Sequence, residues 1–111
     1  MTENINIVKR DGRVVPFDLA RVQMAVFKAA YNGKINGNFI SSYHVDPVKA
    51  NFLANNVAKL VYQDLLKTEK KEVDIEEIQN LVVKHLNVLA KFVGQAYLTY
   101  KTQRRIERGL S

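Results

Sequence analysis

Three cations gather in one short stretch of the chain, NIVKRDGRVVPFD at residues 6–18. Lys9, Arg10 and Arg13 flank the dipeptide Asp11-Gly12, which predicts a β-hairpin because both positions of a two-residue turn need a positive φ. That turn would set Arg10 directly opposite Arg13, and like charges in such a pair repel each other. We interpret the hairpin either as a solvated basic turn that keeps an edge strand soluble, or as a binding site for an anion.

A fourth cation stands at the start of the first predicted helix. Arg21 is the third residue of that helix, where the macrodipole disfavours positive charge. An anion bound to the free backbone N–H groups and to Arg21 would remove this conflict. Lys49 occupies the same position of the second predicted helix, so a solvated cation is the alternative interpretation.

Aromatic and basic residues share one face of the last predicted helix. Tyr97 and Lys101 are four residues apart, as are Tyr100 and Arg104, so rings and cations follow each other along that face. This face would suit phosphate groups. The alternative is a pair of core tyrosines with hydroxyls at the rim, followed by a basic turn that complements the helix dipole.

Other chemistries find little support in the residue types. The chain has no cysteine, which excludes disulfides, thiolate metal sites and thiol catalysis within it. Its two histidines, His44 and His85, lack the spacing of metal ligands. His85 falls on an apolar stripe and is interpreted as a rim or core residue. Asp74, Glu76 and Glu77 are interpreted as first-turn capping residues of a helix and not as a catalytic carboxylate pair.

Length and composition indicate one globular domain. The 111 residues are 47% hydrophobic and 25% charged, and the net charge is +6. That charge favours polyanionic partners such as nucleotides, nucleic acid or an acidic membrane surface. No apolar stretch is long enough to span a membrane, and the first residues lack the pattern of a signal peptide. We therefore expect a cytoplasmic protein without a membrane partner.

Caps and apolar periodicity predict an α+β fold in which a small β-hairpin or three-stranded sheet caps a four-helix bundle. Asp18, Asp46 and Asp74 are the predicted N-caps of three helices, of which the first two end near residues 32 and 67, and a fourth helix begins near Phe92. Residues 32–44 are predicted to be a loop, and residues 72–74 to add a third strand. The third helix should bury one stripe: Ile78, Leu81, Val82, Leu86 and Leu89.

Three motifs in a fixed order resemble a known family. They are VKRDGRVVPFD at 8–18, VDIEEIQNLV at 73–82 and AYLTYKTQRRIER at 96–108. Together they resemble the ATP-cone domain over about residues 5–108. The resemblance implies a single ATP-cone domain over residues 1–111, forming the N-terminal part of a longer enzyme.

The resemblance also implies a function. Similar domains bind ATP or dATP, with Mg²⁺ carried by the nucleotide, and stand at the N-terminus of ribonucleotide reductases. There ATP keeps the enzyme active and dATP switches it off, commonly by changing subunit association. The expected partners are therefore a reductase catalytic domain in the same chain and further copies in a homo-oligomer. The ending YLTYKTQRRIERG most closely resembles the join between cone and catalytic domain in anaerobic, class III reductases, while class I large subunits and cone-bearing radical subunits stay open.

Site residues follow from the same resemblance. Lys9 and Arg10 match the phosphate-contacting pair of the family, and Ile7 matches a strand residue against the base. Lys101 stands where the family motif Tyr-x-x-Tyr-Arg has arginine, so a point charge replaces a bidentate fork. The predicted nucleotide site combines residues of the hairpin, the first helix and the last helix: Ile7, Lys9, Arg10, Arg13, Arg21, Val22, Tyr97, Lys101 and Arg104.

Alternative functions stay open at this point. A nucleotide-responsive transcriptional repressor of the same family carries a zinc ribbon with four cysteines, which this chain lacks. A basic nucleic-acid-binding module would show aromatic residues interleaved on a basic face, and the last helix has only the beginning of one. An enzyme acting on nucleotides is the poorest alternative, because no acid–base constellation replaces the missing cysteines.

Overall fold

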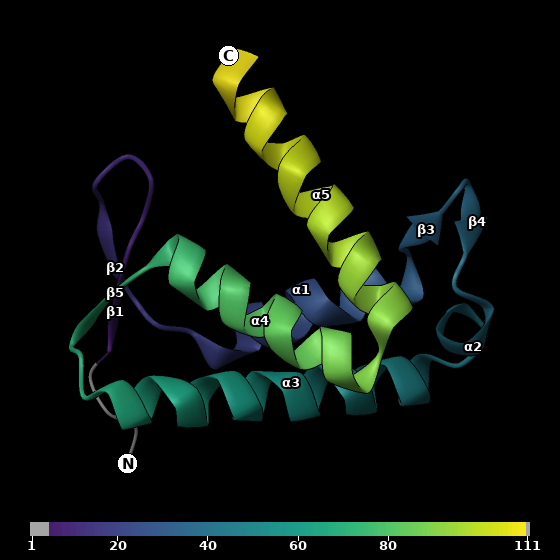
Figure 1. Cartoon of the computed structure of the whole chain (residues 1–111), viewed down its shortest axis with the longest axis horizontal. Helices are drawn as coiled ribbons and strands as arrows, with labels where there is room; N and C mark the ends of the chain where they lie inside the picture. Colours follow the sequence, from purple (N-terminus) through teal and green to yellow (C-terminus); the bar gives the residue numbers. More distant parts are fainter. Residues whose placement is uncertain (1–4, 111) are drawn as a thin grey trace.

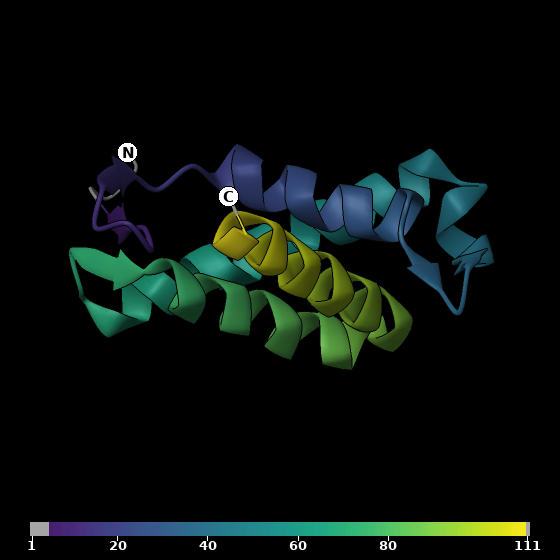
Figure 2. The ribbon, with the colours of Figure 1, turned by 90° about the horizontal axis from the view of Figure 1, so that it is seen from above.

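The structure is a computed structural model that describes residues 5–110, with only the backbone course described for residues 104–110. Within these residues the chain forms five helices, a three-stranded sheet and a second, two-stranded hairpin. The sheet stands at one end of the long helices and the second hairpin at the other, in a flat molecule of 38 × 36 × 19 Å (Figures 1 and 2). The α+β fold class is thus confirmed.

The sheet ties the N-terminal hairpin to the middle of the chain. Its central strand β1 (Asn6–Val8) pairs antiparallel with β2 (Val14–Pro16) and parallel with β5 (Glu72–Asp74). Ile7 lies opposite both Val15 and Val73 and is buried, so the middle of the sheet joins the hydrophobic core. The predicted third strand is therefore present.

The predicted turn of the first hairpin is wrong by one residue. Lys9 donates its backbone N–H to the Arg13 carbonyl at 2.8 Å, and Gly12 donates to the Lys9 carbonyl at 2.9 Å. Three residues therefore form the loop, and Lys9, not Arg10, lies opposite Arg13. Gly12 has a φ of +87°, as expected for a type I turn followed by one left-handed residue. Such a turn needs one positive φ instead of two, so Asp11 stays outside the left-handed region.

All four predicted long helices are present: α1 (Leu19–Tyr31), α3 (Pro47–Thr68), α4 (Ile75–Leu89) and α5 (Lys91–Leu110). The three predicted caps are confirmed, because the side chains of the capping aspartates accept backbone N–H bonds within the first turn. The distances are 3.0 Å from Ala20 N, 3.0 Å from Lys49 N and 2.9 Å from Glu76 N. Each cap satisfies a donor that the helix itself leaves free.

The loop predicted for residues 32–44 is in fact structured. It contains β3 (Lys34–Ile35), β4 (Asn38–Phe39) and the short helix α2 (Ser41–His44). Asn36 and Gly37 both adopt positive φ, of 53° and 81°, which makes the two-residue turn that Asn-Gly favours. The His44 ring stacks on Phe39 with centroids 3.8 Å apart, so the segment packs on itself.

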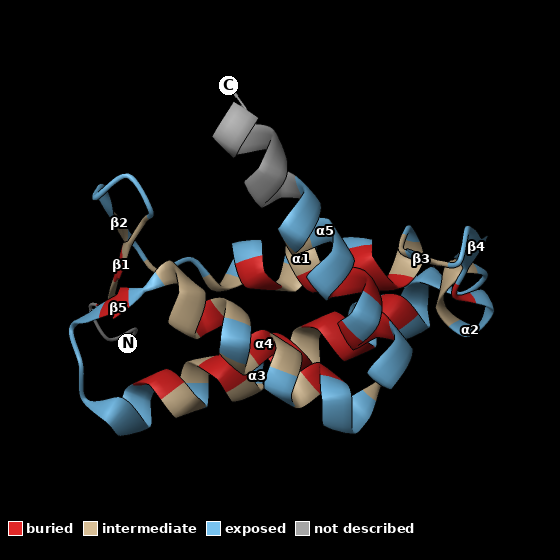
Figure 3. Ribbon diagram, turned by 45° about the horizontal axis from the view of Figure 1, so that its top comes forward, coloured by how far each residue is buried: buried red, intermediate tan, exposed pale blue. Residues whose placement is uncertain are grey.

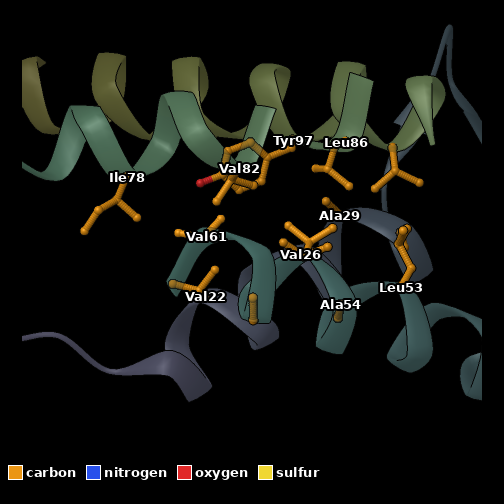
Figure 4. Packing of buried hydrophobic residues seen from close by; sticks show 14 of the residues in the cluster. Val22, Val26, Ala29, Leu53, Ala54, Val61, Ile78, Val82, Leu86 and Tyr97 are labelled. Atoms are coloured by element: carbon orange, nitrogen blue, oxygen red, sulfur yellow. The ribbon is translucent and has the colours of Figure 1, made fainter. Parts of the chain in front are cut away.

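The core lies between the four long helices (Figure 3). Residues of α4 and α5 face residues of α1 and α3 across it, as Figure 4 shows for Val82 and Tyr97 opposite Val22. On α4 the predicted stripe is buried at Ile78, Val82 and Leu86 and half-buried at Leu81. Leu89 is 48% exposed and was wrongly included, because it is the last residue of the helix.

His85 lies at the rim of this core, as interpreted from the sequence. Its Nε2 is 2.7 Å from Asp64 Oδ2, and the Lys84 Nζ lies 3.8 Å from the same oxygen. The interaction joins α4 to α3. The hydrogen bond from His85 lowers the pKa of Asp64 below its usual value, although partial burial opposes the shift.

Within the part of the chain that the structure describes, no helix combines the length and the apolar character needed to cross a bilayer.

We expect Asp64→Asn to lower the free energy of unfolding by about 1 kcal/mol at neutral pH, because a charge-assisted hydrogen bond is lost at a partly exposed site. The folded-state pKa of Asp64 is depressed, so its contribution is present above the unfolded pKa and disappears as the pH falls through the folded value. The difference from the wild type should therefore shrink below about pH 4. Urea unfolding between pH 7 and pH 3 measures it. The exposed Glu72→Gln variant is the control, and a loss independent of pH would contradict the assignment.

Candidate functional site

A cavity of about 700 Å³ opens beneath the first hairpin. Its walls come from β1, β2, the first half of α1, the first half of α4 and one residue of α5. Six residues of the predicted site line it: Ile7, Lys9, Arg13, Arg21, Val22 and Tyr97. The fold therefore brings together side chains from both ends of the sequence.

One wall of the cavity is apolar. Val22 of α1, Ile78 and Val82 of α4 and Tyr97 of α5 are all buried and all line it. In Figure 4 the Tyr97 ring lies beside Val82. Burial raises the pKa of Tyr97 to about 12, so its phenol is uncharged at neutral pH. This wall offers a surface for a flat, uncharged ring.

The rim of the cavity is cationic. Lys9 is half-buried, whereas the side chains of Arg13 and Arg21 are 67% and 81% exposed. Arg13 Nε lies 2.7 Å from Asp11 Oδ2, and Arg21 Nε lies 3.7 Å from an Asp18 carboxylate oxygen. Ion pairs this exposed contribute little to stability, so an incoming anion can replace their carboxylates.

The hydrogen bonds from Arg13 lower the pKa of Asp11, which stays ionised as its partner. Asp18, besides capping α1, lines the cavity and places one negative group at its rim.

Among the described residues, no three histidine or acidic side chains lie close enough to share a metal ion.

Two predicted site residues, Arg10 and Lys101, lie outside the described lining of the cavity. Arg10 is not among the described residues that line the cavity, and its Nη2 lies 2.9 Å from Glu76 Oε1. Lys101 is half-buried on α5, one turn beyond Tyr97, and is likewise outside the described lining. Arg104 belongs to α5, but its side chain lies outside the described residues.

Sequence reasoning missed two informative residues of the lining. Phe17 lines the cavity and stacks on Tyr62 of α3, with ring centroids 5.8 Å apart. Gln79 also lines the cavity, and its Oε1 is buried without a hydrogen-bond partner in the described structure. The available signal was the position of Gln79 on α4, since it is four residues after Ile75 and three before Val82, on the apolar face.

A family model for the ATP cone domain matches residues 5–106. The chain belongs to the ATP-cone family. The match spans every element of the cavity, from β1 to Tyr97 on α5. ATP cones are regulatory domains that bind ATP or dATP, and they are not catalytic. A search among curated proteins returns no match.

The turn that carries the cations gives a test of how this ATP cone holds its ligand. Gly12→Ala and Gly37→Ala should each lower the free energy of unfolding by about 1 kcal/mol, because a Cβ is strained at positive φ. A Cβ at either position would meet no atom within 4 Å, so the loss comes from the backbone alone. Only Gly12→Ala should also weaken ATP binding in calorimetry, since Gly37 belongs to the hairpin at the far end. Equal ATP affinity in both variants would contradict a role of the first turn.

Proposed function

We propose that this ATP cone senses the ratio of ATP to dATP by binding either nucleotide, as its Mg²⁺ complex, in the cavity beneath the first hairpin. The observation that carries the proposal is the meeting of one apolar wall and three cations, Lys9, Arg13 and Arg21, in a single cavity of about 700 Å³. Pockets of this size hold ligands as large as a nucleotide. The family supports the same ligand class.

The two sides of the cavity suit the two parts of a nucleotide. The adenine ring would lie against the apolar side chains, with Ile7 of the central strand beneath it. The triphosphate would lie toward the cationic rim, where charge-assisted hydrogen bonds from Lys9 and the arginines replace water. Mg²⁺ would be held by phosphate oxygens and water, its usual ligands, without a dedicated protein cage.

Lys101 and Arg104 extend this proposal beyond the lining. Lys101 follows Tyr97 by four residues, so both lie on the same face of α5, and Arg104 continues the row. A flexible lysine stem can reach toward phosphates from one turn away. We therefore assign to Lys101 a contact with the outer phosphates.

The regulated enzyme in this proposal is a ribonucleotide reductase of the anaerobic, class III type, with the catalytic domain following the cone in the same cytoplasmic polypeptide. The cone would adjust deoxyribonucleotide synthesis for DNA replication. ATP and dATP differ by one hydroxyl group, so they can switch an enzyme only if they stabilise two states unequally. A change of homo-oligomer is the state change proposed here.

Two basic residues far apart in the sequence provide the first test. Lys9→Ala and Lys101→Ala should each weaken ATP binding by about 1.5 to 3 kcal/mol, the range for a hydrogen bond to a charged group. The double variant should lose less than the sum if both lysines contact one triphosphate. Titration calorimetry measures all three, with Lys59→Ala on the exposed face of α3 as the control. Wild-type affinity in both single variants would remove these lysines from the site.

Self-association provides the second test. Analytical ultracentrifugation of the parent enzyme should show a different oligomer with dATP than with ATP, because the two nucleotides stabilise different assemblies. A nucleic-acid-binding module would instead bind single-stranded DNA tightly, with steep salt dependence and no preference between the nucleotides. Identical sedimentation with both nucleotides, together with tight DNA binding, would favour that alternative.

A further inference from the structure

The side chain of Arg10 forms an ion pair within the protein. Arg10 is the first residue of the hairpin loop and follows Lys9, which lines the cavity. Its guanidinium nevertheless points to α4, where it contacts the Glu76 carboxylate at 2.9 Å. We propose that Glu76 competes with the phosphates of the nucleotide for Arg10, and thereby sets how strongly the cone holds a polyphosphate. This inference rests on the proposed function.

The sheet brings the two residues together. Val8 of β1 lies opposite Asp74 of β5, so the chain that continues to Arg10 runs beside the chain that continues into the first turn of α4. The side chains of Arg10 and Glu76 are 31% and 41% exposed, so their ion pair lies at the surface and is open to solvent. A pair in this position is held weakly enough to exchange partners.

Arg10 can exchange one anionic partner for another without leaving either charge in an unfavourable environment. A guanidinium binds a carboxylate or a phosphate through the same fork of N–H donors, and it cannot hold both through the same donors. When a phosphate takes Arg10, the Glu76 carboxylate stays in the first turn of α4, where the helix dipole favours negative charge. The released carboxylate therefore remains in a favourable environment, and its return provides a ready partner for Arg10 when the nucleotide leaves.

The neighbouring residue Glu77 provides a matched control. It lies in the same turn of α4, and its Oε1 accepts from Lys70 Nζ at 3.2 Å instead of contacting Arg10. Glu76→Gln and Glu77→Gln remove the same charge from the same turn. Only the first of them frees Arg10.

The experiment is titration calorimetry of Mg²⁺-ATP and AMP with the whole chain. Glu76→Gln should bind ATP about threefold to fivefold more tightly than the wild type, the range expected for a partly exposed ion pair. Glu77→Gln should stay within about twofold of the wild type, because the Glu77 carboxylate contacts Lys70 and not Arg10. In an Arg10→Ala background, Glu76→Gln should give no gain, because the residue for which it competes is gone. AMP, which lacks the outer phosphates, should bind the wild type and Glu76→Gln equally.

Several results would overturn the inference. Unchanged or weaker ATP binding by Glu76→Gln would exclude competition, provided that circular dichroism shows the variant folded. An equal gain in Glu77→Gln, or a gain that persists without Arg10, would assign the effect to general electrostatics. Failure of the wild-type chain to bind either nucleotide would overturn the proposed function and this inference together, whereas wild-type binding with no response to Glu76→Gln overturns the inference alone.

Discussion

The parallel pairing of β1 with β5 is the constraint on which the rest of the structure depends. An isolated two-stranded hairpin is marginally stable, and the third strand gives it a fixed place over the helices. Asp74 ends β5 and also caps α4, so the direction of the sheet sets where α4 begins. The cavity exists because the hairpin, held in this way, covers the first turns of α1 and α4 without filling the space between them.

The arginines near the cavity are paired with carboxylates and do not simply crowd against one another. Each of the three arginines near the cavity has a carboxylate within 4 Å: Arg10 has Glu76, Arg13 has Asp11 and Arg21 has Asp18. The cations are thus kept in exposed pairs that hold them near the rim at small energetic gain. An anionic ligand would find these arginines already positioned, and it would have to displace only their weak ion pairs with carboxylates.

Much of the fold could be predicted from the sequence because its signals are local. Aspartate caps and apolar spacing fix the helix starts, and each depends on a few neighbouring residues. The turn at Asp11-Gly12 was predicted in the wrong form because glycine serves both types of turn, and only the pairing of Val8 with Val14 distinguishes them. Gln79 was missed for another reason: its spacing places it on the apolar face of α4, but that this face lines a cavity depends on several elements at once. The family motifs named Lys9, Arg21 and Tyr97, which the fold brings to one cavity, while their contacts with a ligand remain predictions.

The strand pairing also has a consequence for the order of folding. More than half of the chain lies between the paired residues Asn6 and Glu72, so closing that loop carries an entropic penalty that shorter connections avoid. The contacts of α1 with α3, and of α4 with α5, join segments much closer in sequence and can form before the sheet does. The hairpin of β1 and β2 is itself local, so we expect only the docking of β5 against β1 to come late in folding.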